Sequence, residues 1–222
     1  PLGVNLKATT SGGGCLHFQE DDDIKLTFAL IKWAIKDLRE DRCTSNWPHN
    51  LDLPRYFGMN NLALKNANEF TLIGLACVVF HEIGHIKQGH KSGVSVVQEQ
   101  EADDFAADWI LGGVAKDETN KWDKRVIGLA FAYEILTIQS MYSGQYDGIT
   151  HPRTFDRLYR FLERLELPPD HLVYGILVST LKIYFDDLDI KIAAPAFETF
   201  KDCFSFLIDC LDRESQKQLC RF

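Results

Sequence analysis

Two histidines and a glutamate form the pattern His81-Glu82-Ile83-Gly84-His85, which reads H-E-x-x-H. On a helix His81 and His85 project from one face about one turn apart, so both imidazoles can reach one Zn²⁺ at about 2.0–2.1 Å. Glu82 is rotated about 100° from His81, too far round for a third ligand but close enough to touch a water on the metal. Two ligands and an acid beside a bound water are the minimum set of a zinc peptidase, with Glu82 as general base.

The pattern can also arise by chance in a solvated helix, where both histidines would be ordinary side chains. The preceding segment argues against this, because residues 70–80 are apolar or uncharged and predict a largely buried helix. Burying two imidazoles and a carboxylate without partners is costly. We therefore expect a metal-binding helix from about 67 to about 89, capped by Asn66.

A third ligand is predicted on the following helix, 96–111. Glu99 is the expected ligand, and it completes a site for one Zn²⁺ per chain. Asp103 lies one turn later on the same face and is placed to accept the free N–H of a zinc-bound histidine, His81 rather than His85. Alanines on this face let the two helices approach closely, as a shared metal requires.

Two nearby polar residues are interpreted as lying away from the metal. Glu101 is the rival ligand, but it is rotated about 200° from Glu99 and is interpreted as a solvated charge. His90 follows His85 by five residues and would be rotated about 140° from the ligand face of a continuing helix. We therefore interpret His90 as structural.

These motifs carry a family resemblance. H-E-x-x-H followed by E-x-x-A-D resembles the gluzincin metallopeptidases, and the fuller string HEIGHIKQGH…EQEADDFAADWILG is similar to the cytosolic Lit-type phage-exclusion peptidases. It also resembles the HtpX and CAAX-prenyl-protease group and, more distantly, the ImmA/IrrE repressor-cleaving peptidases. The resemblance covers roughly residues 66–160. It implies a zincin-like metallopeptidase domain that hydrolyses an intracellular host protein such as elongation factor Tu, with a phage component as activator.

A further segment extends the resemblance. Thr150-His151-Pro152, with Arg157 five residues after the proline, resembles the T-H-P-x-x-x-x-R segment of the HtpX group. The resemblance implies that His151 enters the active site and helps to hold the transition-state oxyanion, and that Arg157 binds the substrate or the oxyanion. A helix cap for His151 and a structural ion pair for Arg157 are the alternatives.

Four further polar residues are candidates for roles near the site. Glu134 lies on an apolar stripe of its helix, and because a buried carboxylate needs a partner, Arg157 or another cation is expected beside it. Three tyrosines are candidate oxyanion donors, and the sequence does not choose among them: Tyr133, Tyr142 and Tyr146.

The fold class indicated by the pattern of elements is mainly α with a small β element. We expect strands at 14–19, 53–57 and 61–64, and helices at 22–40, 67–89, 96–111, 119–141, 152–166, 170–187 and 195–213. Together they predict a single metallopeptidase domain, 1–222, with an N-terminal lobe, a zinc-site core and C-terminal helices at 1–65, 66–160 and 161–222 respectively.

Composition narrows the function classes. The chain has 222 residues, is 45% hydrophobic and carries a net charge of −8, which provides no basic surface for nucleic acid. No run of about 18 uncharged apolar residues exists, so no membrane span is expected. Six cysteines without paired spacing predict reduced thiols in a cytoplasmic protein. The start at Pro1 instead of methionine suggests a cleaved tag or a piece of a longer protein.

The partners expected are a protein substrate and an activating protein. Two other classes of function share the same ligands. A zinc-stabilised regulatory module would not need Glu82, and a small-molecule zinc hydrolase would need a closed pocket instead of an open groove. Both alternatives remain open at the level of sequence.

Overall fold

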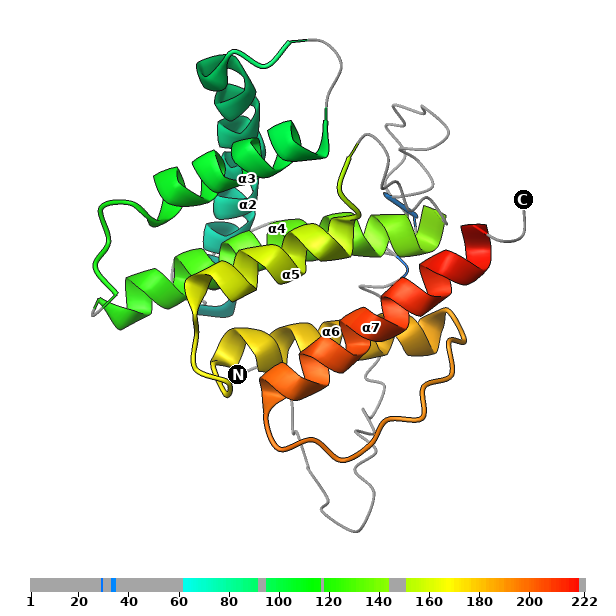
Figure 1. Ribbon diagram of the computed structural model, residues 1–222. Helices are drawn as coiled ribbons and strands as arrows, with labels where there is room; N and C mark the ends of the chain where they lie inside the picture. The colour runs from blue at the N-terminus through cyan, green and yellow to red at the C-terminus, as the bar shows by residue number, and fades with distance from the viewer. Residues whose placement is uncertain are drawn as a thin grey trace. The chain divides into compact units, whose positions relative to one another are not determined.

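A computed structural model describes residues 29, 33–34, 62–91, 95–116, 118–143 and 151–219. The chain divides into two compact units, Pro1–Lys65 and Asn66–Phe222. The labelled helices are α2 (Leu62–Gln88), α3 (Val96–Leu111), α4 (Thr119–Ser143), α5 (Thr154–Leu165), α6 (Leu172–Asp187) and α7 (Phe200–Leu219) (Figure 1). The expectation of a mainly helical protein is confirmed. The described residues include no strand, and the strands expected at 14–19 and 53–57 lie outside them.

Helix α3 begins and ends at the residues that its sequence predicts. The Ser95 hydroxyl accepts from the backbone of Gln98, and the Gln98 side chain accepts from the backbone of Ser95, which is a capping box. At the other end the Gly112 N–H donates to the Asp108 carbonyl at 2.8 Å. Local capping chemistry therefore determines the extent of α3.

Helix α2 begins earlier than expected and ends within one residue of the expected position. It begins at Leu62, so the strand expected at 61–64 and the cap at Asn66 are wrong. Leucine, alanine and lysine at positions 62–65 are good helix formers with no breaker among them. At its C-terminus Gly89 has φ +70°, and the N–H of His90 donates back to the His85 carbonyl at 3.0 Å. This is a Schellman turn, and it reverses the chain directly after Gln88.

Helix α4 packs against several neighbours. It lies beside α5 and α6, α3 contacts both α4 and α5, and α7 contacts α5 and α6 (Figure 1). Their buried faces are apolar, with the largest fully buried side chains being Tyr133, Tyr174, Phe155, Phe185, Phe204, Leu129, Leu158, Leu162, Leu177, Leu181, Leu207 and Leu211. Burial of these faces is the main stabilising contribution of the helical unit.

Helix α2 meets α4 at a glycine. A Cβ added to Gly128 would lie 2.7 Å from the Ile73 side chain, so only glycine permits this contact. Lys124 of α4 also donates to Glu69 of α2 at 2.5 Å. These contacts attach the helix that carries the two histidines to the core.

Helices α3 and α5 are joined by charged side chains. Asp104 accepts from Arg160 and from Arg164, and Asp108 accepts from Arg164 at 2.6 Å. Exposed ion pairs stabilise little individually. These pairs therefore add modest links between α3 and α5, and Arg157 is held by its own contacts with Asp103.

The outer face of α2 is apolar and exposed. Its exposed large side chains are Leu72, Leu75, Val78, Val79, Ile83 and Ile86. By length and composition alone, Lys65–Gln88 is the one helix in the described part of the chain that could cross a membrane. The same helix also carries His81, Glu82 and His85. The absence of a membrane span stays a prediction.

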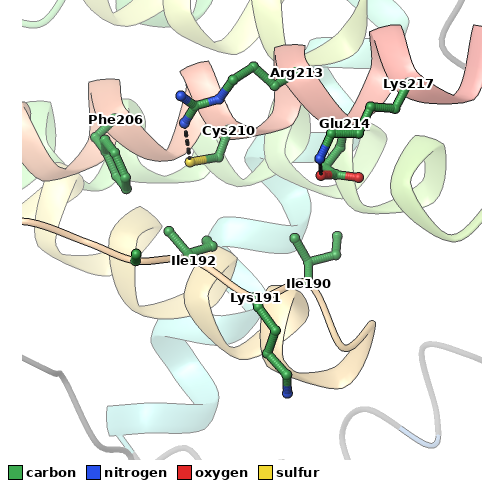
Figure 2. Close-up of a pocket in the computed structure, with 9 residues that line it drawn as sticks. Ile190, Lys191, Ile192, Phe206, Cys210, Arg213, Glu214 and Lys217 are labelled. Atoms are coloured by element: carbon green, nitrogen blue, oxygen red, sulfur yellow. Dashed lines mark hydrogen bonds and ion pairs between the residues drawn. The ribbon is translucent and has the colours of Figure 1, made fainter.

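The connection between α6 and α7 lines a pocket. Residues 188–199 connect the two helices, and α7 begins at Phe200 and not at the expected residue 195. The pocket has a volume of about 320 Å³ and places Ile190 and Ile192 opposite Cys210 and its neighbours (Figure 2). Arg213 donates to the Cys210 Sγ at 3.0 Å. The three cysteines within the described residues are free thiols: Cys77, Cys203 and Cys210.

Candidate metal centre

Helices α2 and α3 touch where the candidate ligands lie. A Cβ added to Gly84 would lie 3.1 Å from the Ala102 Cα and 3.3 Å from its carbonyl oxygen. Ala102 is fully buried at this contact. Because the two backbones are this close, the histidine side chains of α2 can reach the carboxylate side chains of α3.

His81, His85 and Glu99 form one cluster. The Nε2 atoms of His81 and His85 are 3.1 Å apart, and they lie 3.4 and 3.2 Å from the two carboxylate oxygens of Glu99. Four donors placed tetrahedrally about 2.0–2.1 Å from a zinc ion lie about 3.3 Å from one another. The spacing and the residue types therefore fit a metal ion, and these three residues could hold one.

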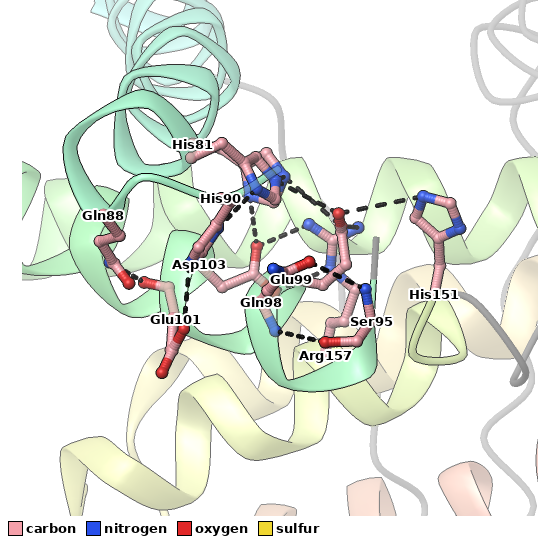
Figure 3. Close-up of polar contacts among 11 residues, drawn as sticks. His81, Gln88, His90, Ser95, Gln98, Glu99, Glu101, Asp103, His151 and Arg157 are labelled. Atoms are coloured by element: carbon pink, nitrogen blue, oxygen red, sulfur yellow. Dashed lines mark hydrogen bonds and ion pairs between the residues drawn. The ribbon is translucent and has the colours of Figure 1, made fainter. Parts of the chain in front are cut away.

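Asp103 supports His81 from the side opposite the cluster. Its Oδ1 lies 2.9 Å from His81 Nδ1, and Arg157 donates to both of its oxygens at 2.8 and 2.5 Å (Figure 3). Burial raises the pKa of Asp103, but the hydrogen bonds from His81 and Arg157 outweigh burial and hold that pKa below its usual value. Asp103 is therefore an ionised acceptor that fixes the His81 ring.

The donor atoms also suit a cation electrostatically. A neutral His81 that donates from Nδ1 to Asp103 presents only a lone pair at Nε2. That lone pair faces the Glu99 carboxylate, whose side chain is only 5% exposed. Acceptor atoms that face one another in a dry site repel, and a metal ion between them removes this repulsion.

His90 and Glu101 lie beside the cluster, and for His90 this corrects the expectation from sequence. The Nδ1 of His90 is 2.8 Å from the Nδ1 of His85, and its Nε2 is 3.0 Å from Glu101 Oε2. The rotation of 140° assumed a continuing helix, whereas the turn at Gly89 brings His90 back beneath His85. Gln88-Gly89 is the sequence signal that predicts this turn, since glycine is common after a helix C-terminus.

The remaining predicted site residues lie around the cluster. Glu82 follows His81 on α2 and is exposed. His151 is at the rim, with Nε2 3.9 Å from a Glu99 oxygen. Since Arg153 is the N-cap of α5, the helix-cap alternative for His151 is wrong. Arg157 donates hydrogen bonds to Asp103, and its Nη1 lies 3.9 Å from the second Glu99 oxygen.

Two of the candidate tyrosines are described, and neither is an exposed donor at the cluster. Tyr133 is buried, and the centroid of its ring lies 5.8 Å from the guanidinium carbon of Arg157. The Tyr142 hydroxyl donates to Asp187 at 2.6 Å. Tyr146 lies outside the described residues.

Glu134 has no ion pair among the described residues, so the expected pairing with Arg157 is wrong. Its carboxyl group hydrogen-bonds the Thr180 side chain, and Oε1 has no hydrogen-bond partner in the described part of the chain. Burial raises the pKa of Glu134 to about 8. The group is therefore protonated inside the core at neutral pH, which replaces the need for a cation.

The helices and the cluster define a helical protein with a candidate metal site of two histidines and one glutamate. The chain belongs to the Peptidase U49 family, whose model matches residues 5–177. It is similar to the "Cell death peptidase" of Escherichia coli (strain K12), with 29% identity over 174 residues. That match covers 76% of this chain and 57% of the relative, so the chain spans little more than half of it. The resemblance to Lit-type peptidases is confirmed. No solved structure matches significantly.

Proposed function

We propose that this chain is a zinc-dependent metalloendopeptidase that cleaves an intracellular protein in phage exclusion or a related defence response. The convergence of His81, His85 and Glu99 at 3.1–3.4 Å is the observation that carries the proposal. Membership of Peptidase U49 and likeness to a protein named as a cell death peptidase support the reaction class. A host protein is the proposed substrate, a phage component the proposed activator, and the cytoplasm the proposed location.

The chain's own residues have separate tasks in the proposed reaction. A zinc ion held by the cluster would polarise the scissile carbonyl and lower the pKa of a water. Glu82 takes the proton from that water and delivers it to the leaving amine. His151, at the rim of the cluster, is placed to help hold the oxyanion. Arg157 acts at a distance by keeping Asp103 ionised and in place.

The test combines metal content with hydrolysis of a proteome-derived peptide library, read by mass spectrometry. We expect one zinc per chain in the wild type and in Glu82→Gln, and loss of zinc in His81→Ala. Hydrolysis should fall by about 10²–10⁴-fold in Glu82→Gln, because only proton transfer is removed. Glu118→Gln, an exposed acid remote from the cluster, is the matched control and should keep both properties.

Three results would contradict the proposal. A wild type without metal would remove the zinc site. Bound zinc without hydrolysis, even with the activator present, would indicate a zinc-stabilised regulatory module. Cleavage of small esters but of no peptide would indicate a small-molecule hydrolase.

A further inference from the structure

His90 and Glu101 have no task in the proposed reaction. His90 contacts both Glu101 and His85, which is a candidate metal ligand. The His90 side chain is only 8% exposed, although it lies just beyond the end of α2. Both of its nitrogens are in contact, Nδ1 with His85 and Nε2 with Glu101. A loop histidine on a surface would not be buried with both nitrogens engaged.

The position of His90 is set by the backbone. The Schellman turn at Gly89 directs the chain back under the last turn of α2. The Gln88 side chain donates to the Glu101 carbonyl at 3.1 Å, which ties the end of α2 to α3 beside the same glutamate. His90 and Glu101 are thus brought together by contacts that do not depend on either side chain.

The hydrogen-bond partners determine the tautomer of each ring. An ionised Glu101 can only accept, so Nε2 of His90 carries the hydrogen and Nδ1 of a neutral His90 is an acceptor. His85 must then donate from its own Nδ1. Its Nε2 is left with a lone pair, and that atom faces His81 and Glu99.

We infer that His90 and Glu101 are positioning residues that hold His85 as a metal ligand. The inference rests on the proposed function, because it assigns to His85 the same role at the metal. His81 is supported by Asp103 and Arg157, and His85 is supported by this second pair. The two supporting pairs differ in exposure, since the Glu101 side chain is 51% exposed whereas Asp103 is buried. Ligand histidines of zinc sites generally need such an acceptor.

The experiment measures zinc affinity by competition with a chelator, and the His85 tautomer by nitrogen NMR of the zinc-free and zinc-bound chain. We expect His90→Ala to weaken zinc affinity by about 10–100-fold and to mix the His85 tautomers. His90→Asn should recover most of the affinity, because its carbonyl oxygen replaces the lost acceptor. The zinc affinity of Glu101→Ala should lie between the affinities of His90→Ala and His90→Asn. Asp108→Ala, an exposed acid on the same helix, should match the wild type.

Either of two results would overturn the inference. One is wild-type zinc affinity and a single His85 tautomer in His90→Ala. The other is equal weakening in His90→Ala and His90→Asn, which would indicate a packing role alone. If the wild type bound no zinc, the proposed function would fail. The His85 tautomer of the zinc-free chain would then still test whether His90 and Glu101 orient the ring.

Discussion

At the scale of single residues, Asp103 connects the candidate ligand His81 to the rest of the protein. One of its oxygens contacts both His81 and Arg157, and the other accepts from Arg157. Its burial makes this pairing important, since a buried charge without its partner is strongly destabilising. Asp103 therefore serves both the geometry of the cluster and the attachment of α5.

Removing Asp103 should affect metal binding and stability together. We expect Asp103→Ala to lower zinc affinity by about 10–100-fold. It should also lower the free energy of unfolding by about 3–5 kcal/mol, because the buried Arg157 loses both hydrogen bonds to Asp103 and keeps only the longer contact with Glu99 among its described carboxylate partners. Asp103→Asn should lose less affinity, since it keeps an acceptor for His81. Calorimetric zinc titration and urea unfolding measure the two effects.

The neighbouring acid is the matched control. Asp104 belongs to the same helix but pairs with Arg160 and Arg164, away from the cluster. Asp104→Asn should change stability by about 1 kcal/mol or less and leave zinc affinity as it is. Equal losses of affinity at the two positions would contradict a specific role for Asp103.

At the scale of elements, the predictions match the bounds of α3 but not the turn after α2 or the start of α7. The bounds of α3 followed from Ser95, Gln98 and Gly112, which act within one turn of the helix. Helix α7 begins at Phe200 and not at the expected residue 195 because Thr199 caps it: the Thr199 hydroxyl accepts from the Asp202 N–H at 3.1 Å.

The same distinction applies to the site. The H-E-x-x-H spacing depends only on helix geometry, and the predicted cluster of His81, His85 and Glu99 is brought together as expected. Asp103 also lies where helix periodicity placed it, beside His81. The contacts of His90 depend on a turn that periodicity does not describe. The side-chain partners of Arg157 depend on the packing of α5, which one sequence does not reveal.

The crossing of α2 and α3 gives a prediction for Gly84. A Cβ here meets backbone atoms of Ala102 that cannot move independently of α3. We expect Gly84→Ala to lower the free energy of unfolding by about 1–3 kcal/mol and to weaken zinc binding, because the helices are pushed apart. Thermal unfolding of the zinc-free protein and zinc titration of the folded protein separate the two effects.

Gly175 supplies the control for that substitution. It is also a helical glycine, but an added Cβ would meet only the Phe200 ring at 3.6 Å, an ordinary contact. Gly175→Ala should therefore be neutral or stabilise the protein by up to about 1 kcal/mol, through reduced backbone freedom. If both substitutions behaved alike, close approach at Gly84 would not be a constraint.

At the scale of the whole molecule, the helical unit extends beyond the family match. The match ends at residue 177, within α6, whereas α7 continues the packing against α5 and α6. Lys201 at the start of α7 pairs with Glu163 of α5 at 2.8 Å. Residues outside the matched region therefore help to support the helix that positions Arg157.

Global stability should depend on pH through Glu134, which lies between α4 and α6. Its pKa is raised from 4.5 to about 8 by burial, opposed by the hydrogen bond with Thr180. Between these values the folded chain holds a proton that the unfolded chain releases. The contribution of Glu134 to the free energy of unfolding therefore falls by about 1.4 kcal/mol per pH unit as pH rises through this window.

Substitution by glutamine isolates this effect. Glu134→Gln cannot ionise, so the variant should gain more stability relative to wild type at pH 8 than at pH 5. Urea unfolding of the zinc-free protein at both values provides the comparison. Glu118→Gln, at an exposed position, should show no such difference. An equal gain at both pH values would contradict a proton held by Glu134.

The turn at Gly89 restricts the length of the segment between His85 and His90. Because backbone hydrogen bonds close this turn, inserting or deleting one residue between His85 and His90 would swing His90 away from its partner. The five-residue interval should therefore tolerate no change of length, and neither should the four-residue interval between the two candidate ligand histidines. A search for proteins built in this way should accordingly use the longer signature H-E-x-x-H-x-x-x-G-H, with an acid eleven residues beyond its last histidine.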